Sequence, residues 1–222
     1  MILFKNEPAF YKRFFILAFP IALQSLISIG VNMLDTIMVG KLGKMALSAT
    51  SLANSFISIY HIFCMGLGMG ASVLVSRYWG MKKADINNTG EGEKATRALK
   101  KTVALMLRLP LILASVFALL TLFIPQAIMK TYTSEAEIIE LGSIYFKYSI
   151  VAYFFLGLSL VSTIVLRSVG QVKLPLFVSI GAFFVNLLAN YAFIFGKFGM
   201  PRMEVAGAAI GTLIARIFEA TI

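Results

Sequence analysis

Residues 14–40 form an apolar run that is long enough to cross a lipid bilayer, and this run contains a single acid. About 20 apolar residues, each rising about 1.5 Å, span a hydrocarbon core of about 30 Å. Asp35 lies inside the run, where an ionisable side chain costs about 3 kcal/mol unless it faces protein or water. The run therefore predicts a transmembrane helix in which Asp35 faces a protein interior or an aqueous cavity.

Five further apolar runs follow, and together they define the fold class. The six predicted spans cover residues 14–40, 46–79, 102–124, 140–166, 174–195 and 205–222. With 59% hydrophobic and 14% charged residues, the chain is far more apolar than a soluble domain. Runs of this length are typical of helices, not of the ten-residue strands of an outer-membrane barrel. We therefore predict an all-α integral membrane protein in which residues 1–222 form one six-helix transmembrane bundle.

The net charge of +10 comes mainly from the segments between the spans. Basic residues gather before the first span and in the stretches 80–101 and 167–173, which would all lie on one side of the membrane. Cytoplasmic loops are enriched in Lys and Arg. This distribution predicts a multi-pass protein of the plasma or inner membrane with a cytoplasmic N-terminus, and it explains the basic charge without a nucleic-acid partner.

The first span carries a polar stripe. Its members are Gln24, Ser28, Asn32 and Asp35, which share one face of a helix. The functional interpretation is the wall of a transport cavity, which Met38 could also line; the alternatives are hydrogen bonds between helices and, for Met38, apolar packing. Because a low-dielectric cavity favours the protonated form of a carboxylate, Asp35 could exchange a proton for a cation.

The fifth span repeats the pattern with Ser179, Asn186 and Asn190 on one face. An asparagine offers a carbonyl oxygen to a cation and N–H groups to a carboxylate. Hydrogen bonding between helices is an equally good interpretation of this pair. His61, the single histidine, could relay protons, but a hydrogen-bonded structural role is the favoured interpretation.

The sequence offers little support for an enzyme or for a bound cofactor. It contains no HExxH or GxSxG arrangement, and the glycine-rich stretch 66–71 lacks the strand–turn–helix context of a dinucleotide loop. A single cysteine, Cys64, cannot form a disulfide or a cysteine metal site within one chain. We therefore predict no catalytic residue, no metal centre and no cofactor other than a coupling ion.

Five segments carry a family resemblance. They are DTIMVGKLGKMALSATSLA (35–53), GLGMGASVLVSRYWG (66–80), LRSVGQ (166–171), NLLANYAFIFG (186–196) and VAGAAIGTLIAR (205–216). In this order, and over nearly the whole chain, they resemble multidrug and toxic compound extrusion (MATE) transporters. The resemblance implies a twelve-helix transporter of two six-helix bundles, of which this chain is the N-terminal one. It also implies export of cationic and amphipathic compounds by alternating access, in exchange for H⁺ or Na⁺.

The resemblance assigns roles to four residues. Asp35 matches the first-helix aspartate, which is the family's ion-coupling residue in this bundle, and Asn186 matches a fifth-helix asparagine that lines the same pocket. Asn190 stands where some proton-coupled members carry a second aspartate, so Asp35 would have to bind H⁺ or Na⁺ as the only acid there. Thr212 is a looser match to a wall residue of the sixth helix.

The predicted function is therefore efflux of small organic cations or amphipathic drugs by antiport. The last span is still apolar at Ile222, so we expect the C-terminal bundle to come from the rest of a longer transporter or from a second chain. One alternative is a flippase of related architecture for lipid-linked glycans, which should hold phosphates with several cationic side chains. Beyond Asp35, the charges inside the spans here include Arg108, Lys147 and Arg216. The other alternative is a membrane fragment or scaffold that does not transport.

Overall fold

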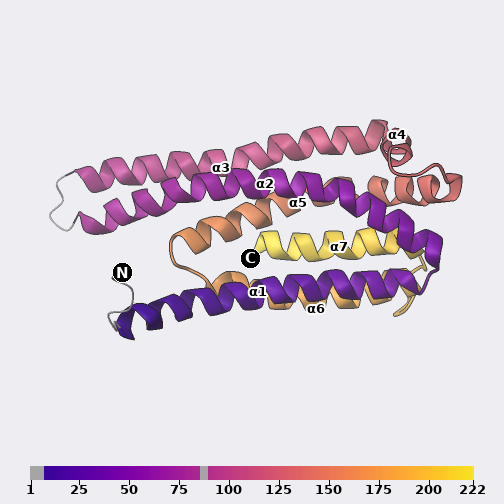
Figure 1. Ribbon diagram of the computed structural model, residues 1–222, viewed down its shortest axis with the longest axis horizontal. Coiled ribbons are helices and arrows are strands. Elements are labelled where there is room, and N and C mark those ends of the chain that lie inside the picture. Colours follow the sequence, from indigo (N-terminus) through magenta and orange to yellow (C-terminus); the bar gives the residue numbers. More distant parts are fainter. Residues whose placement is uncertain (1–7, 86–89) are drawn as a thin grey trace, which may run out of the picture.

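The computed structural model describes residues 8–85 and 90–222, and in these residues it contains helices and no β-strand. The helices are α1 (Pro8–Gly40), α2 (Lys44–Ala84), α3 (Glu91–Phe123), α4 (Pro125–Lys130), α5 (Ala136–Ser168), α6 (Lys173–Phe195) and α7 (Glu204–Thr221). All except the short α4 run along the longest axis of the molecule (Figure 1). The predicted all-α fold is confirmed.

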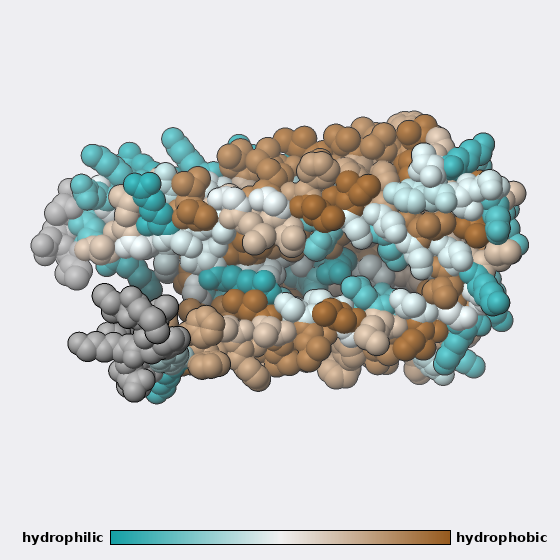
Figure 2. Space-filling view, viewed as in Figure 1, coloured by the Kyte–Doolittle hydropathy of each residue, from teal (hydrophilic) through white to brown (hydrophobic). Residues whose placement is uncertain are grey.

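Among the described residues, α1, α2, α3, α5 and α6 are long and apolar enough to cross a membrane. The helix α7 has 18 residues and carries three charges, at Glu204, Arg216 and Glu219. At about 1.5 Å per residue, α2 is roughly 60 Å long and extends well beyond a hydrocarbon core. Hydrophilic residues gather at both ends of the long axis, and hydrophobic residues cover much of the middle (Figure 2). The chain is therefore a multi-pass membrane protein.

The helix boundaries extend the predicted spans. Residues 91–101, part of the basic stretch, form the first turns of α3. Pro125 occupies the first turn of α4, where the N–H that proline lacks would have no intrahelical partner. Gly43 reverses the chain between α1 and α2 with φ of 119°, a conformation that L-residues rarely adopt. Residues 1–7 and 86–89, some of whose charges enter the predicted orientation, lie outside the described part.

The helices pack in two groups that meet at α7. The first group consists of α2, α3 and α5; in the second, α1 packs on α6, and α7 contacts both α6 and α5. Ala49 and Ala53 of α2 are completely buried in the largest core cluster, together with Phe146 of α5 and Ile194 of α6. Small residues of this kind let membrane helices approach closely. The helix α1 contacts α2 far less than it contacts α6. The consecutive helices α1 and α2 can therefore form opposite walls of a cavity.

Tyr60 joins the three helices of the first group. Its hydroxyl donates to the carbonyl oxygens of Pro110 on α3, at 3.2 Å, and of Tyr153 on α5, at 2.9 Å. Replacing Tyr60 by Phe should lower the free energy of unfolding by about 1 kcal/mol, because these buried bonds are lost. Chemical unfolding followed by circular dichroism measures this change. The exposed Tyr148→Phe is the control, and equal stability of the two variants would contradict the role of Tyr60.

Candidate functional site

A cavity of about 770 Å³ lies between α1, α2, α5, α6 and α7. Figure 2 shows it as a hollow with hydrophilic residues inside, between the two groups of helices. Its volume is in the range of sites that bind drug-sized molecules. A polar cavity between membrane-spanning helices is the arrangement that the stripe on the first span predicts.

Asp35, in the wall of this cavity, is bonded to Asn190, which is buried and does not itself line the cavity. Its Oδ1 accepts a hydrogen bond of 2.6 Å from Asn190 Nδ2 on α6, and the same Nδ2 lies 3.2 Å from Asn186 Oδ1. Asn190 is completely buried, and its Oδ1 has no hydrogen-bond partner among the described residues. The site thus combines a carboxylate with two amides, and the oxygen of the Asn190 amide has no hydrogen-bond partner among the described residues.

A glycine on α7 makes room for this contact. A Cβ atom at Gly211 would collide with Asn190 Oδ1 and would lie 3.0 Å from the Asn190 backbone nitrogen. One turn earlier, a Cβ at Gly207 would lie 2.6 Å from the backbone carbonyl of Phe193. The spacing of small residues in VAGAAIGTLIAR therefore lets α7 press against α6 at the level of Asp35.

Most of the predicted site residues lie around this one cavity. Those in its wall are Gln24, Ser28, Asn32, Asp35, Ser179, Asn186 and Thr212. Gln24 Nε2 also donates a buried hydrogen bond of 2.8 Å to Ser179 Oγ, which joins α1 to α6. Gln24 and Ser179 therefore both line the cavity and form a hydrogen bond between helices, so the two interpretations of the polar stripe hold together for this pair.

Met38 lies elsewhere than predicted. Its side chain is 8% exposed and packs in the largest core cluster, and it does not line the cavity. Near the turn at Gly43, α1 converges with α2, and neighbouring Val39 and Ala46 are buried in the same cluster. Apolar packing, the default for methionine, accounts for this position.

An arginine from α5 was not predicted as a site residue. Arg167, the basic residue in the last turn of α5, lines the cavity and donates from Nη2 to Gln24 Oε1. Gln24 thus connects Arg167 of α5 with Ser179 of α6. The sequence feature that could have identified Arg167 is its position in LRSVGQ, at the end of an apolar span.

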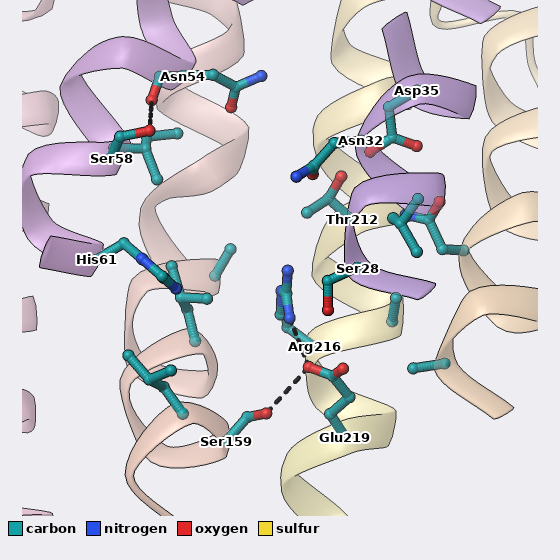
Figure 3. A pocket seen from close by; sticks show the side chains of 18 of the residues that line it. Ser28, Asn32, Asp35, Asn54, Ser58, His61, Ser159, Thr212, Arg216 and Glu219 are labelled. Atoms are coloured by element: carbon teal, nitrogen blue, oxygen red, sulfur yellow. Dashed lines mark hydrogen bonds and ion pairs between the residues drawn. The ribbon is translucent and has the colours of Figure 1, made fainter. Parts of the chain in front are cut away.

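A second charged group comes from α7 (Figure 3). Arg216 Nη1 lies 2.6 Å from Glu219 Oε2, and the same oxygen accepts a hydrogen bond of 3.0 Å from Ser159 Oγ on α5. His61 of α2 lines the cavity and has no hydrogen-bond partner among the described residues. The hydrogen-bonded structural role that the sequence favoured for His61 is therefore not seen in this part of the chain. The i, i+3 spacing of Arg216 and Glu219 in an apolar segment was the sequence signal for this pair.

The charges in the cavity wall balance. Asp35 and Glu219 are acidic, Arg167 and Arg216 are basic, and both arginines are bonded to side chains. Arg108 and Lys147 are not among the lining residues. The excess of cationic side chains expected of a glycan flippase is absent from the described lining of this cavity.

Comparison with known proteins places the chain among transporters. The MatE family profile matches residues 20–89 and 90–192. The chain is 29% identical to a probable multidrug resistance protein NorM of Thermotoga maritima, over 99% of this chain and 46% of that protein. It is also 29% identical to the multidrug resistance protein NorM of Burkholderia vietnamiensis, over 89% of this chain and 40% of that protein. The chain therefore spans less than half the length of these relatives.

Solved structures show the same fold. An outward-facing multidrug resistance MATE transporter superposes with a TM-score of 0.79 at 20% identity, over 95% of this chain and 43% of that one. A transporter from Pyrococcus furiosus, described as having a binding pocket of reversed polarity, superposes equally well with the same coverage. The bundle therefore has the fold of one part of these larger transporters.

Proposed function

Because the chain belongs to the MatE family of transporters, we propose that it is one six-helix bundle of a multidrug efflux transporter that exchanges organic cations for H⁺ or Na⁺. The observation that carries this proposal is the position of Asp35. Its carboxylate lies in the wall of a drug-sized cavity between membrane-spanning helices and is bonded to Asn190 of another helix. An acid in such a position is a site for a cation or a proton.

In this proposal, ionised Asp35 holds the positive charge of the substrate. A proton on Asp35, or Na⁺ coordinated by its carboxylate, would cancel that attraction and release the substrate. For Na⁺, the side-chain oxygens of Asn186 and Thr212, which line the cavity with Asp35, are hard ligands of the kind that this cation prefers. Occupancy of the site by substrate or by ion would then bias the transporter between its inward- and outward-facing states.

We further propose that transport needs a second bundle. The cavity lies between α1 and the α2–α5 side of the molecule, and the chain spans less than half the length of the related transporters. A second bundle, in the same polypeptide or in another, would complete a central pathway. The distribution of basic residues supports a cytoplasmic N-terminus in the cell membrane.

Binding of a fluorescent organic cation tests the proposal. We expect ethidium to bind the purified chain in detergent at about pH 8, with binding that weakens at least about tenfold (about 1.4 kcal/mol) when the coupling ion occupies Asp35. Fluorescence anisotropy is measured between about pH 5 and pH 8, and at constant pH with Na⁺ replacing K⁺. Weakening by acid alone identifies H⁺, and weakening by Na⁺ identifies Na⁺. No binding, or binding insensitive to both ions, contradicts the proposal.

A further inference from the structure

We infer that Arg216 provides a second charged subsite in the cavity, which holds the carboxylate of a substrate whose cationic group sits at Asp35. The preferred substrates are then zwitterionic amphipathic compounds that carry one positive and one negative group. This inference rests on the proposed function, because it names the substrate class of the same cavity.

The guanidinium of Arg216 is placed to receive an anion. The side chain is 31% exposed and extends into the cavity, on the side of α7 that faces His61 of α2 and Ser28 of α1 (Figure 3). Among the described residues, Nη1 is its one nitrogen with a hydrogen-bond partner, Glu219. A guanidinium has five N–H groups in a planar fork that matches a carboxylate. Most of these donors remain for a ligand.

Glu219 positions Arg216 and weakens its positive charge. One oxygen, Oε2, accepts both from Arg216 and from Ser159, and the Glu219 side chain is only 14% exposed. Glu219 is therefore anchored to α5 through Ser159, and it orients Arg216, which lies one turn before it on α7. A substrate carboxylate must compete with Glu219 for the guanidinium, so removal of the Glu219 charge should strengthen that interaction.

Asp35 and Arg216 lie at different levels along α7. The contact of Asp35 with Asn190 lies at the level of Gly211 on α7, and Arg216 follows five residues later. Five residues of helix correspond to about 7.5 Å along its axis. A compound with a cationic and an anionic group at opposite ends of an aromatic scaffold can therefore reach both sites, whereas Arg216 would repel the second charge of a dication.

The other arginine of the cavity is a poorer subsite. Arg167 donates from Nη2 to Gln24, and its Nε is buried without a partner among the described residues. Its guanidinium is therefore partly used in joining helices and partly shielded by protein. Arg216 is the cation that combines exposure to the cavity with donors that are not already bonded.

A matched pair of dyes tests the inference. Rhodamine B carries a cationic ring system and a carboxylate, and its ethyl ester lacks the negative charge. We expect the purified chain at about pH 8 to bind the acid about tenfold more tightly than the ester, the effect of one good charged hydrogen-bond pair. Arg216→Gln should bring this ratio to about one with ester binding retained, and Arg216→Lys, the matched control, should keep a preference for the acid. Fluorescence anisotropy gives all the dissociation constants.

Glu219→Gln should change the preference for the acid over the ester in the opposite direction to Arg216→Gln. It should raise the acid-to-ester preference several-fold, a gain that a folding defect cannot produce. A wild-type ratio near one, an unchanged ratio in Arg216→Gln, or no gain in Glu219→Gln overturns the inference, while ester binding by the wild type leaves the proposed function standing. If the wild type binds neither dye, both the proposed function and this inference fail.

Discussion

Replacing Asp35 by asparagine should weaken the binding of an organic cation by more than about 100-fold, which corresponds to about 3 kcal/mol. Asparagine has nearly the same size and can still accept the hydrogen bond from Asn190, so the contact between α1 and α6 is retained. The negative charge is lost, however, so the cation no longer has an opposite charge at this point of the cavity wall. Anisotropy titration of ethidium at about pH 8 measures the change, and the remaining weak binding should no longer depend on pH or Na⁺.

Glu137→Gln is the matched control for Asp35→Asn. It also removes one carboxylate, but from an exposed position in the first turn of α5, outside the cavity. We expect its affinity for ethidium to remain within about twofold of the wild type, because exposed charges far from the ligand are screened. Binding by Asp35→Asn that is as tight as binding by Glu137→Gln would show that Asp35 does not hold the cation.

Replacing Gly207 by alanine should lower the stability of the bundle by about 2 kcal/mol. The added Cβ would lie 2.6 Å from the carbonyl carbon and oxygen of Phe193 and 2.8 Å from the backbone nitrogen of Ile194. These are backbone atoms of α6, which cannot move aside by a change of rotamer, so α6 and α7 must separate. For a chain of this size, the midpoint of thermal unfolding should fall by roughly 4–8 °C, as measured by circular dichroism in detergent.

Gly70→Ala separates this packing effect from the general effect of replacing a glycine in a helix. A Cβ at Gly70 of α2 meets nothing within 4 Å. Alanine is favoured over glycine in a helix by about 1 kcal/mol, so the midpoint of this control should stay the same or rise. If both variants melt at the same temperature, close packing of α7 on α6 at Gly207 is not important for stability.

The location and class of the helices follow from the chain alone. Apolar runs locate the segments that lie in lipid. Such a segment must satisfy its own backbone hydrogen bonds, so these runs predict the all-α fold. The period of the helix places Gln24, Ser28, Asn32 and Asp35 on one face, and the cost of a charge in lipid predicts that this face is sheltered. The structure shows all four in the wall of one cavity.

Contacts between helices are a different matter, because they depend on the rotation and axial register of each helix against its neighbours. The bond from Asn190 to Asp35 joins residues 155 positions apart and exists because Gly211 lets α7 press against α6. Periodicity alone could not separate Met38, which the convergence of α1 with α2 buries, from the cavity residues of the same helix. The sequence likewise contains the i, i+3 pair of Arg216 and Glu219 in an apolar segment, but it does not show that this pair faces the cavity. The chain thus determined which faces are polar, and only close packing of the helices decided which polar groups meet.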